Sequence, residues 1–129
     1  MGAWVLMLAC CLLTPLLMWG AGELMLARPP RAINAVVGYR TRRSMMNQDT
    51  WDFANRQMAL IWRRWGLGML AAALGGMLPL LSRANDDMVY WWGLVIMALE
   101  VIVLCASIVP VERALRRTFD EDGARKESL

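Results

Sequence analysis

The stretch "MVYWWGLVIMALEVIVLCASIV", residues 88–109, decides the fold class, because this long apolar run carries a single charge, Glu100. An α-helix of roughly 20 apolar residues crosses a bilayer core of about 30 Å. Two further apolar runs, at about 3–26 and 65–82, carry only Glu23 between them. Three strands could not close a barrel, and lipid tolerates no open sheet edge. We therefore predict an all-α integral membrane protein with one membrane domain of three transmembrane helices.

Composition supports this prediction and argues against several functional classes. Apolar residues make up 58% of the chain and charged residues 19%, which shifts the usual soluble balance toward lipid. The chain has no His, and Cys10, Cys11 and Cys105 all fall in predicted spans, so neither a disulfide framework nor a metal site is expected. We expect no cofactor and no nucleic-acid partner, and an enzyme is the least favoured class. No Ser–His pair, metal-ligand set or phosphate-binding glycine loop is present.

The N-terminal run could also be a cleaved signal peptide. No Lys or Arg precedes it, and it is longer than the roughly 7–15 residues of a typical signal hydrophobic region. We expect it to be retained as the first span.

Arginine placement predicts the orientation. The loop 28–64 holds eight Arg, whereas the loop between the second and third runs holds only Arg83, and the tail 111–129 again holds four Arg and one Lys. Cytoplasmic loops carry the excess of Lys and Arg. We therefore expect a multi-pass protein of the bacterial cytoplasmic (inner) membrane, with its N-terminus outside and its C-terminus inside.

The loop 28–64 is predicted to contain a cytoplasmic interfacial helix that leads into the second span. Apolar residues recur at helical spacing and share one face, whereas most of the charges fall elsewhere. Asn47 is a plausible N-cap with Asp49 in the first turn, and Gly66 and Gly68 permit either a bend or a continuous helix. The apolar face comprises Trp51, Ala54, Met58, Ile61, Trp62 and Trp65. The tail is expected to begin with a helical turn and then to be frayed and solvated.

The second span carries a stripe of small residues, Gly68, Ala72 and Gly76, spaced four apart. Such stripes let membrane helices approach closely. We expect this one to pack on another helix of the chain or on a second copy, which would make the protein a homo-oligomer. The alternative is that Ala and Gly are simply common in membrane spans.

The two intramembrane carboxylates, Glu100 and Glu23, are candidate functional groups. Glu100 falls near the middle of its span, where a charge is expensive and often functional. It could titrate a proton, bind a cation, or tie helices together through a hydrogen bond. Glu23 lies close to Arg28 and is expected to be a charge at the membrane rim.

The string "GYRTRRSMMNQDTWDFAN", residues 38–55, resembles the signature of the SdpI family of small bacterial membrane proteins. The residues that match are Asn34, Gly38, Tyr39, Arg40, Thr41, Arg43, Ser44, Met45, Asn47, Trp51, Ala54 and Asn55. The family is named for an immunity protein. The resemblance implies protection against a membrane-active antimicrobial peptide or toxin, with its presence relayed to a cytoplasmic regulator. We expect this chain to correspond to the three-span signature portion of the namesake, without the additional N-terminal spans.

The residue types of this motif also indicate a structured binding site. Gly38 permits a turn, Tyr39 and Trp51 suit the membrane interface, and Ser44 and Asn47 are expected to cap the next helix. Its three arginines, Arg40, Arg42 and Arg43, can hold a phosphate or a carboxylate. We expect Arg40 to be buried or half-buried and to contact Glu23, Glu100 or a lipid phosphate, in that order.

Two other functions remain open. The chain could be a small proton-coupled transporter or transporter subunit that uses Glu100, or a structural or lipid-binding adaptor. Membrane lipids are expected partners in every case.

Overall fold

The computed structural model describes residues 2–34, 38–82 and 85–126. Along the chain it forms α1 (Gly2–Ala27), α2 (Gln48–Met77), the short 3₁₀ helix η1 (Leu78–Leu81), α3 (Asp86–Ala106) and α4 (Ile108–Thr118). Within these residues, three helical stretches are long and apolar enough to cross a membrane: α1, α2 with η1, and α3 with α4. The prediction of an all-helical chain with three helices long and apolar enough to cross a membrane is confirmed in these residues.

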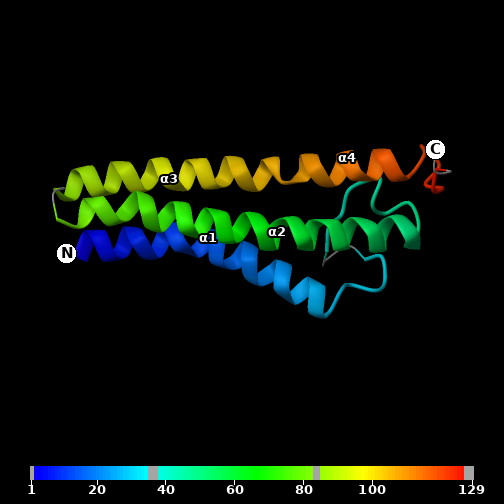
Figure 1. The fold of residues 1–129 in the computed structure, drawn as a ribbon, viewed down its shortest axis with the longest axis horizontal. Helices are drawn as coiled ribbons and strands as arrows, with labels where there is room; N and C mark the ends of the chain where they lie inside the picture. The colour runs from blue at the N-terminus through cyan, green and yellow to red at the C-terminus, as the bar shows by residue number, and fades with distance from the viewer. Residues whose placement is uncertain (1, 35–37, 83–84, 127–129) are drawn as a thin grey trace.

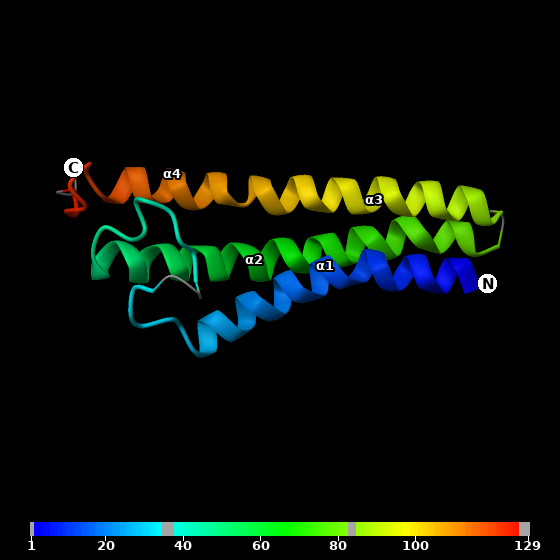
Figure 2. The ribbon, with the colours of Figure 1, turned by 180° about the vertical axis from the view of Figure 1, so that it is seen from behind.

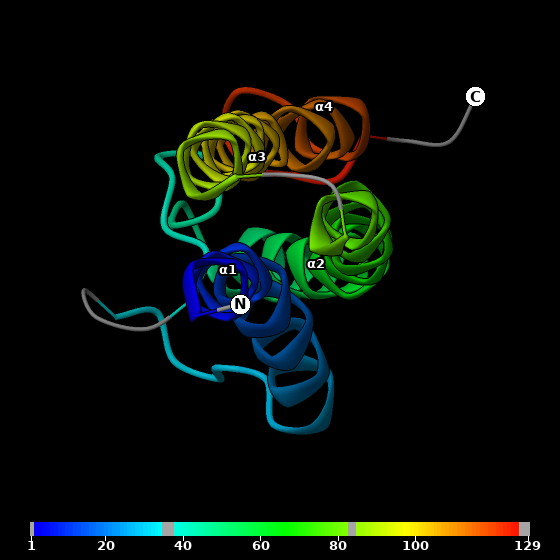
Figure 3. The ribbon, with the colours of Figure 1, turned by 90° about the vertical axis from the view of Figure 1, so that its left-hand side faces the viewer.

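The three stretches lie side by side and alternate in direction (Figures 1 and 2). The N-terminus and the turn between α2 and α3 share one end, which we call the turn end. The loop after α1, the start of α2 and the C-terminal tail share the other, which we call the motif end. Seen along the bundle, the helices form a triangle, and the second half of α1 leans outward (Figure 3). Arg83 and 127–129, which entered the sequence predictions, lie outside the described residues.

The closest helix contact joins α1 to α2 through two glycines. A Cβ atom added to Gly22 would lie 2.6 Å from the Arg63 backbone nitrogen, and one added to Gly66 would lie 2.6 Å from that of Trp19. Two helix backbones approach this closely only where the residue between them has no side chain. Pro15 is buried inside α1 and has no N–H to donate to the carbonyl four residues earlier. A proline within a helix bends it, which explains why the second half of α1 leans outward.

The predicted stripe on α2 is not the face that packs within the chain. Gly68 would meet nothing within 4 Å if it carried a Cβ atom, Ala72 is exposed, and only Gly76 approaches α3, at Ile96. The buried face of α2 instead follows Gly66, Met69, Ala73 and Met77. The prediction of a packing stripe within the chain is therefore wrong for Gly68 and Ala72. Contact with a second copy remains a prediction.

α2 is one continuous helix without a break at the glycines. Asn47 is its N-cap, as predicted, and forms a capping box with Thr50. Trp51, Ala54 and Met58 are buried, whereas Arg56 and Arg63 are exposed. The first half of α2 thus has a packed face and a polar face. Its position in the membrane interface stays a prediction.

The third span breaks earlier than predicted and then continues. We expected the helix to end near Val109, but α3 ends at Ala106 and α4 begins at Ile108. The cause is Pro110, which has no N–H for the carbonyl of Ala106 four residues earlier. Ser107 lies at the break, where its Oγ accepts a 3.0 Å hydrogen bond from Trp62 Nε1. The break between α3 and α4 is therefore hydrogen-bonded to α2.

Candidate functional site

The motif loop turns back on α2 at Gly38. Gly38 has a φ of 112°, and an added Cβ atom would lie 2.7 Å from Asn55 Oδ1. That oxygen accepts a 2.7 Å hydrogen bond from the Tyr39 backbone N–H, while Asn55 Nδ2 donates to the Trp51 carbonyl at 2.9 Å. Asn55 is 2% exposed, so its side-chain amide gives the buried Tyr39 N–H the hydrogen bond that water cannot supply there. Gly38 and Asn55 therefore act together to fix the loop.

Tyr39 links this loop to α4. Its ring is buried in a cluster with Ala54 and Met58 of α2 and with Val111 and Leu115 of α4. Its hydroxyl donates a 2.8 Å hydrogen bond to Glu112 Oε1. Burial, together with this bond, raises the pKa of the Tyr39 hydroxyl above its usual range. The tyrosine packs in the core of the site and is not a lipid-facing anchor.

The next turn is held by hydroxyl groups. Ser44 Oγ donates to the Tyr39 carbonyl at 2.9 Å and accepts from the Thr41 N–H at 2.8 Å. Thr50 Oγ1 donates to the Ser44 carbonyl at 3.1 Å. We expected Ser44 to cap α2, but Thr50 partners Asn47 in that role and Ser44 closes the preceding turn. Trp51 is fully buried, and its Nε1 donates to the Pro30 carbonyl at 2.8 Å, which ties the chain after α1 to α2.

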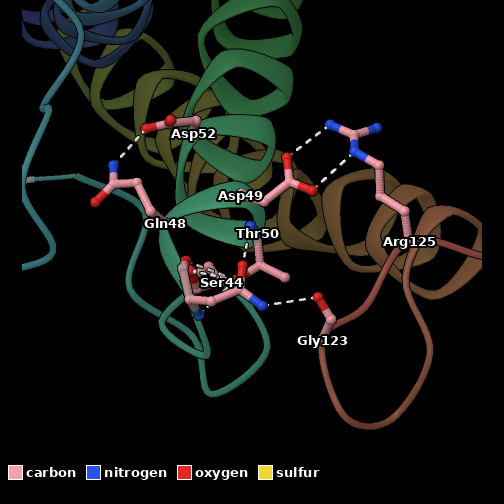
Figure 4. A network of polar contacts seen from close by, with 8 residues as sticks. Ser44, Gln48, Asp49, Thr50, Asp52, Gly123 and Arg125 are labelled. Carbon is pink, nitrogen blue, oxygen red and sulfur yellow. Dashed lines mark hydrogen bonds and ion pairs between the residues drawn. The ribbon is translucent and has the colours of Figure 1, made fainter.

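The C-terminal tail folds back onto the start of α2, so the prediction of a frayed tail is wrong for 119–126. Asn47 Nδ2 donates to the Gly123 carbonyl at 2.7 Å, and both oxygens of Asp49 pair with Arg125 at 2.8 Å (Figure 4). Phe119 is 2% exposed and meets Phe53 edge-on at 5.3 Å between ring centroids. The Arg125 guanidinium lies 5.1 Å from the Phe119 ring centroid. The N-cap of α2 thus also holds the tail.

The arginines of the motif are not buried. Arg40 and Arg42 are exposed and Arg43 is partly buried, so Arg40 is not the buried cation that we expected. Glu23 pairs with Arg63 of α2 at 3.2 Å, which replaces the predicted pair with Arg40 and joins α1 to α2. Asn34 also lies in the described part, where its Nδ2 donates to the Ala32 carbonyl at 2.9 Å.

A polar hollow of about 580 Å³ opens between the motif loop, α4 and the tail. Its lining contains both positive groups and carboxylates. Its lining comprises Thr41, Arg42, Arg43, Met46, Glu112, Glu121 and Asp122. Glu112 both lines the hollow and accepts the Tyr39 hydroxyl bond. Sequence reasoning missed this hollow, because its carboxylates come from a tail that was expected to be solvated.

The model of the SdpI/YfhL protein family matches residues 31–111, which is more than half of the chain. The chain belongs to this family. The matched range contains the motif loop, α2, α3 and the start of α4, so the SdpI/YfhL match extends from the motif loop through the second and third helical stretches. The chain is also similar to "Uncharacterized protein YfhL" of Bacillus subtilis (strain 168), at 56% identity over 39 residues. That match covers 30% of this chain and 36% of the relative. No solved structure matches.

Glu100 lies apart from the motif end, within α3 of this SdpI/YfhL chain. It is 5% exposed, and neither carboxyl oxygen has a hydrogen-bond partner in the described part of the chain. Cys11 of α1 packs against the same helix, where its thiol donates to the Gly93 carbonyl about two helical turns before Glu100. No three His, Cys, Asp or Glu side chains gather in metal-binding fashion within the described residues.

Proposed function

We propose that this member of the SdpI/YfhL family is a membrane-anchored binding protein whose cytoplasmic face is the motif end. In this proposal it protects its cell from a membrane-active peptide or toxin and relays the bound state to a cytoplasmic regulator. The observation that carries the proposal is the polar hollow of about 580 Å³. Family signature residues build one side of it, and the tail builds the other.

The chemistry of the hollow favours a charged polypeptide partner. Arg42 and Arg43 can hold a carboxylate through paired N–H donors, while Glu121 and Asp122 can hold a cation. Both signs within one hollow restrict which partners fit, because a misplaced like charge is costly. A partner there would also touch Glu112 of α4, which continues the third span into the membrane. That continuity offers a route by which events in the membrane reach the partner.

The orientation belongs to this proposal, and the arginine-rich loop and tail support it. A reporter fused at Asp86 should be extracytoplasmic, and reporters fused at Asn47 or after Lys126 should be cytoplasmic. A cytoplasmic reporter at Asp86 would contradict the placement of the site.

Protection can be tested in a sensitive bacterial host that expresses the full chain. We expect the chain to reduce the depolarisation caused by at least one of a panel of amphipathic, membrane-permeabilising peptides. Arg42→Ala combined with Arg43→Ala should abolish the reduction without changing membrane abundance. The matched control is Arg64→Ala, an exposed arginine on α2 away from the hollow. Equal protection by all three proteins would refute the role of the hollow, and protection by none would refute the immunity proposal.

A further inference from the structure

Glu100 is a buried carboxyl group that the proposed binding site does not use. It is 5% exposed, and no described residue gives either oxygen a hydrogen bond. Buried polar groups without partners are rare and call for an explanation. Intramembrane carboxyl groups that face the interior of a helix bundle commonly carry protons or ions.

The part of α1 that packs against the same helix is unusual as well. Cys11 is fully buried, and its thiol donates to the Gly93 carbonyl of α3 at 3.5 Å. Pro15 lies four residues further along α1 and has no N–H for the backbone carbonyl of Cys11. The helix that packs on α3 therefore has a backbone carbonyl without its usual helical donor. A neutral carboxyl group has the O–H donor that such an acceptor needs, and a carboxylate does not.

An apolar crevice lies on the motif-end side of Glu100. It has a volume of about 330 Å³ between α1, α2 and α3, and its lining includes Thr14, Trp62 and Leu104. Leu104 is one helical turn from Glu100. Beyond it, Ser107 Oγ donates to the Leu104 carbonyl at 2.5 Å and accepts from Trp62. The crevice thus leaves open space between the helices one turn from Glu100, on the side of the break between α3 and α4.

We propose that Glu100 is a reversible proton-binding site inside the membrane and that its protonation state sets how closely α1 packs on α3. With the proton bound, the carboxyl group is neutral and α1 stays close to α3. When the proton leaves to water, the carboxylate requires hydration and α1 moves away. The site is independent of the partner-binding hollow.

Few other titratable groups face this position. α1 contributes only the thiols of Cys10 and Cys11 at this level. α2 has no charged residue between Trp65 and Met77, and the first charged residue of α4 is Glu112. Any pH dependence of helix packing at this level should therefore come from Glu100 or from ionisation of the two thiols. A variant without the Glu100 carboxyl group shows the thiol contribution alone.

A hydrophobic carbodiimide tests the proton itself. The reagent takes the proton of a neutral carboxyl group on one nitrogen while the carboxyl oxygen bonds to its central carbon, so a carboxylate alone does not react. With the full chain in lipid nanodiscs, dicyclohexylcarbodiimide should label Glu100, and labelling should fall about tenfold from one pH unit below its midpoint to one unit above. Glu100→Gln should remove this label. Labelling that is absent, or constant between about pH 5 and about pH 9, would overturn the proposal.

A second measurement tests the change in packing. In a chain with Cys10→Ala and Cys105→Ala, Cys11 is the remaining thiol, and its alkylation by a small maleimide reports access between α1 and α3. Alkylation should rise more steeply with pH when residue 100 is Glu than in Glu100→Gln, which keeps a neutral side chain of the same size. Identical pH profiles in the two proteins would refute the link between Glu100 and packing.

Discussion

Replacing Gly66 with alanine should destabilise the bundle, whereas the same change at Gly68 should not. The added Cβ atom at Gly66 would lie 2.6 Å from the Trp19 nitrogen and 2.9 Å from its Cα, both of which are backbone atoms that cannot rotate away. Overpacking of this kind costs about 1–3 kcal/mol, and the upper end applies because α1 itself must shift. Alanine recovers about 1 kcal/mol of helix propensity, so the net loss is about 2 kcal/mol.

Gly68 is the matched control, since it lies two residues along the same helix and an added Cβ atom there meets nothing within 4 Å. Gly68→Ala should therefore be neutral or more stable by up to about 1 kcal/mol. Thermal unfolding of both variants in one detergent, followed by circular dichroism, measures the difference directly. If Gly66→Ala melts at or above the temperature of Gly68→Ala, the close α1–α2 contact is refuted.

Three further predictions concern the motif end and use the same unfolding assay. Tyr39→Phe should cost about 1–2 kcal/mol at neutral pH by removing the bond to Glu112. Because the pKa of Tyr39 is raised in the folded state, the stability that the tyrosine contributes is complete below about pH 10 and is lost at higher pH. Tyr39→Phe should therefore lose less stability in alkali than the unmodified protein. Parallel alkaline profiles of the two proteins would contradict this. Asn55→Ala should cost about 2 kcal/mol by leaving the Tyr39 N–H unsatisfied, and full stability would exclude that bond. Phe119→Ala should cost about 3 kcal/mol, whereas exposed Asp122→Ala should cost little; equal effects would mean that the tail is not packed.

The sequence predicts the spans well because lipid imposes a simple requirement. Each apolar run must be long enough to cross the bilayer with every backbone group bonded internally, and this requirement can be read from composition alone. The N-cap at Asn47 was also predictable, since capping depends on residues a few positions apart. The end of α3 was displaced by three residues because Pro110 acts on the carbonyl of Ala106 rather than at its own position.

The packing face of α2 could not be found in the same way. Gly68, Ala72 and Gly76 are as evenly spaced as any contact stripe, but helix contact depends on which face the neighbour approaches. The neighbour is α1, and it approaches along the line of Gly66, Met69 and Ala73. Spacing within one helix carries no information about that direction. The folded tail was missed for a related reason, since its stability comes from Asp49 and Asn47, more than seventy residues away in sequence.

The division of labour within the motif follows from burial. Gly38, Tyr39, Ser44 and Asn55 face inward and use their polar atoms on backbone groups or on Glu112, so they shape the loop and cannot at the same time bind a partner through those atoms. The arginines at positions 42 and 43 extend from that shaped loop into the hollow. Substitutions of the inward group should therefore lower stability and function together. Substitutions of the two arginines should lower function alone, and this contrast separates a binding surface from a structural loop.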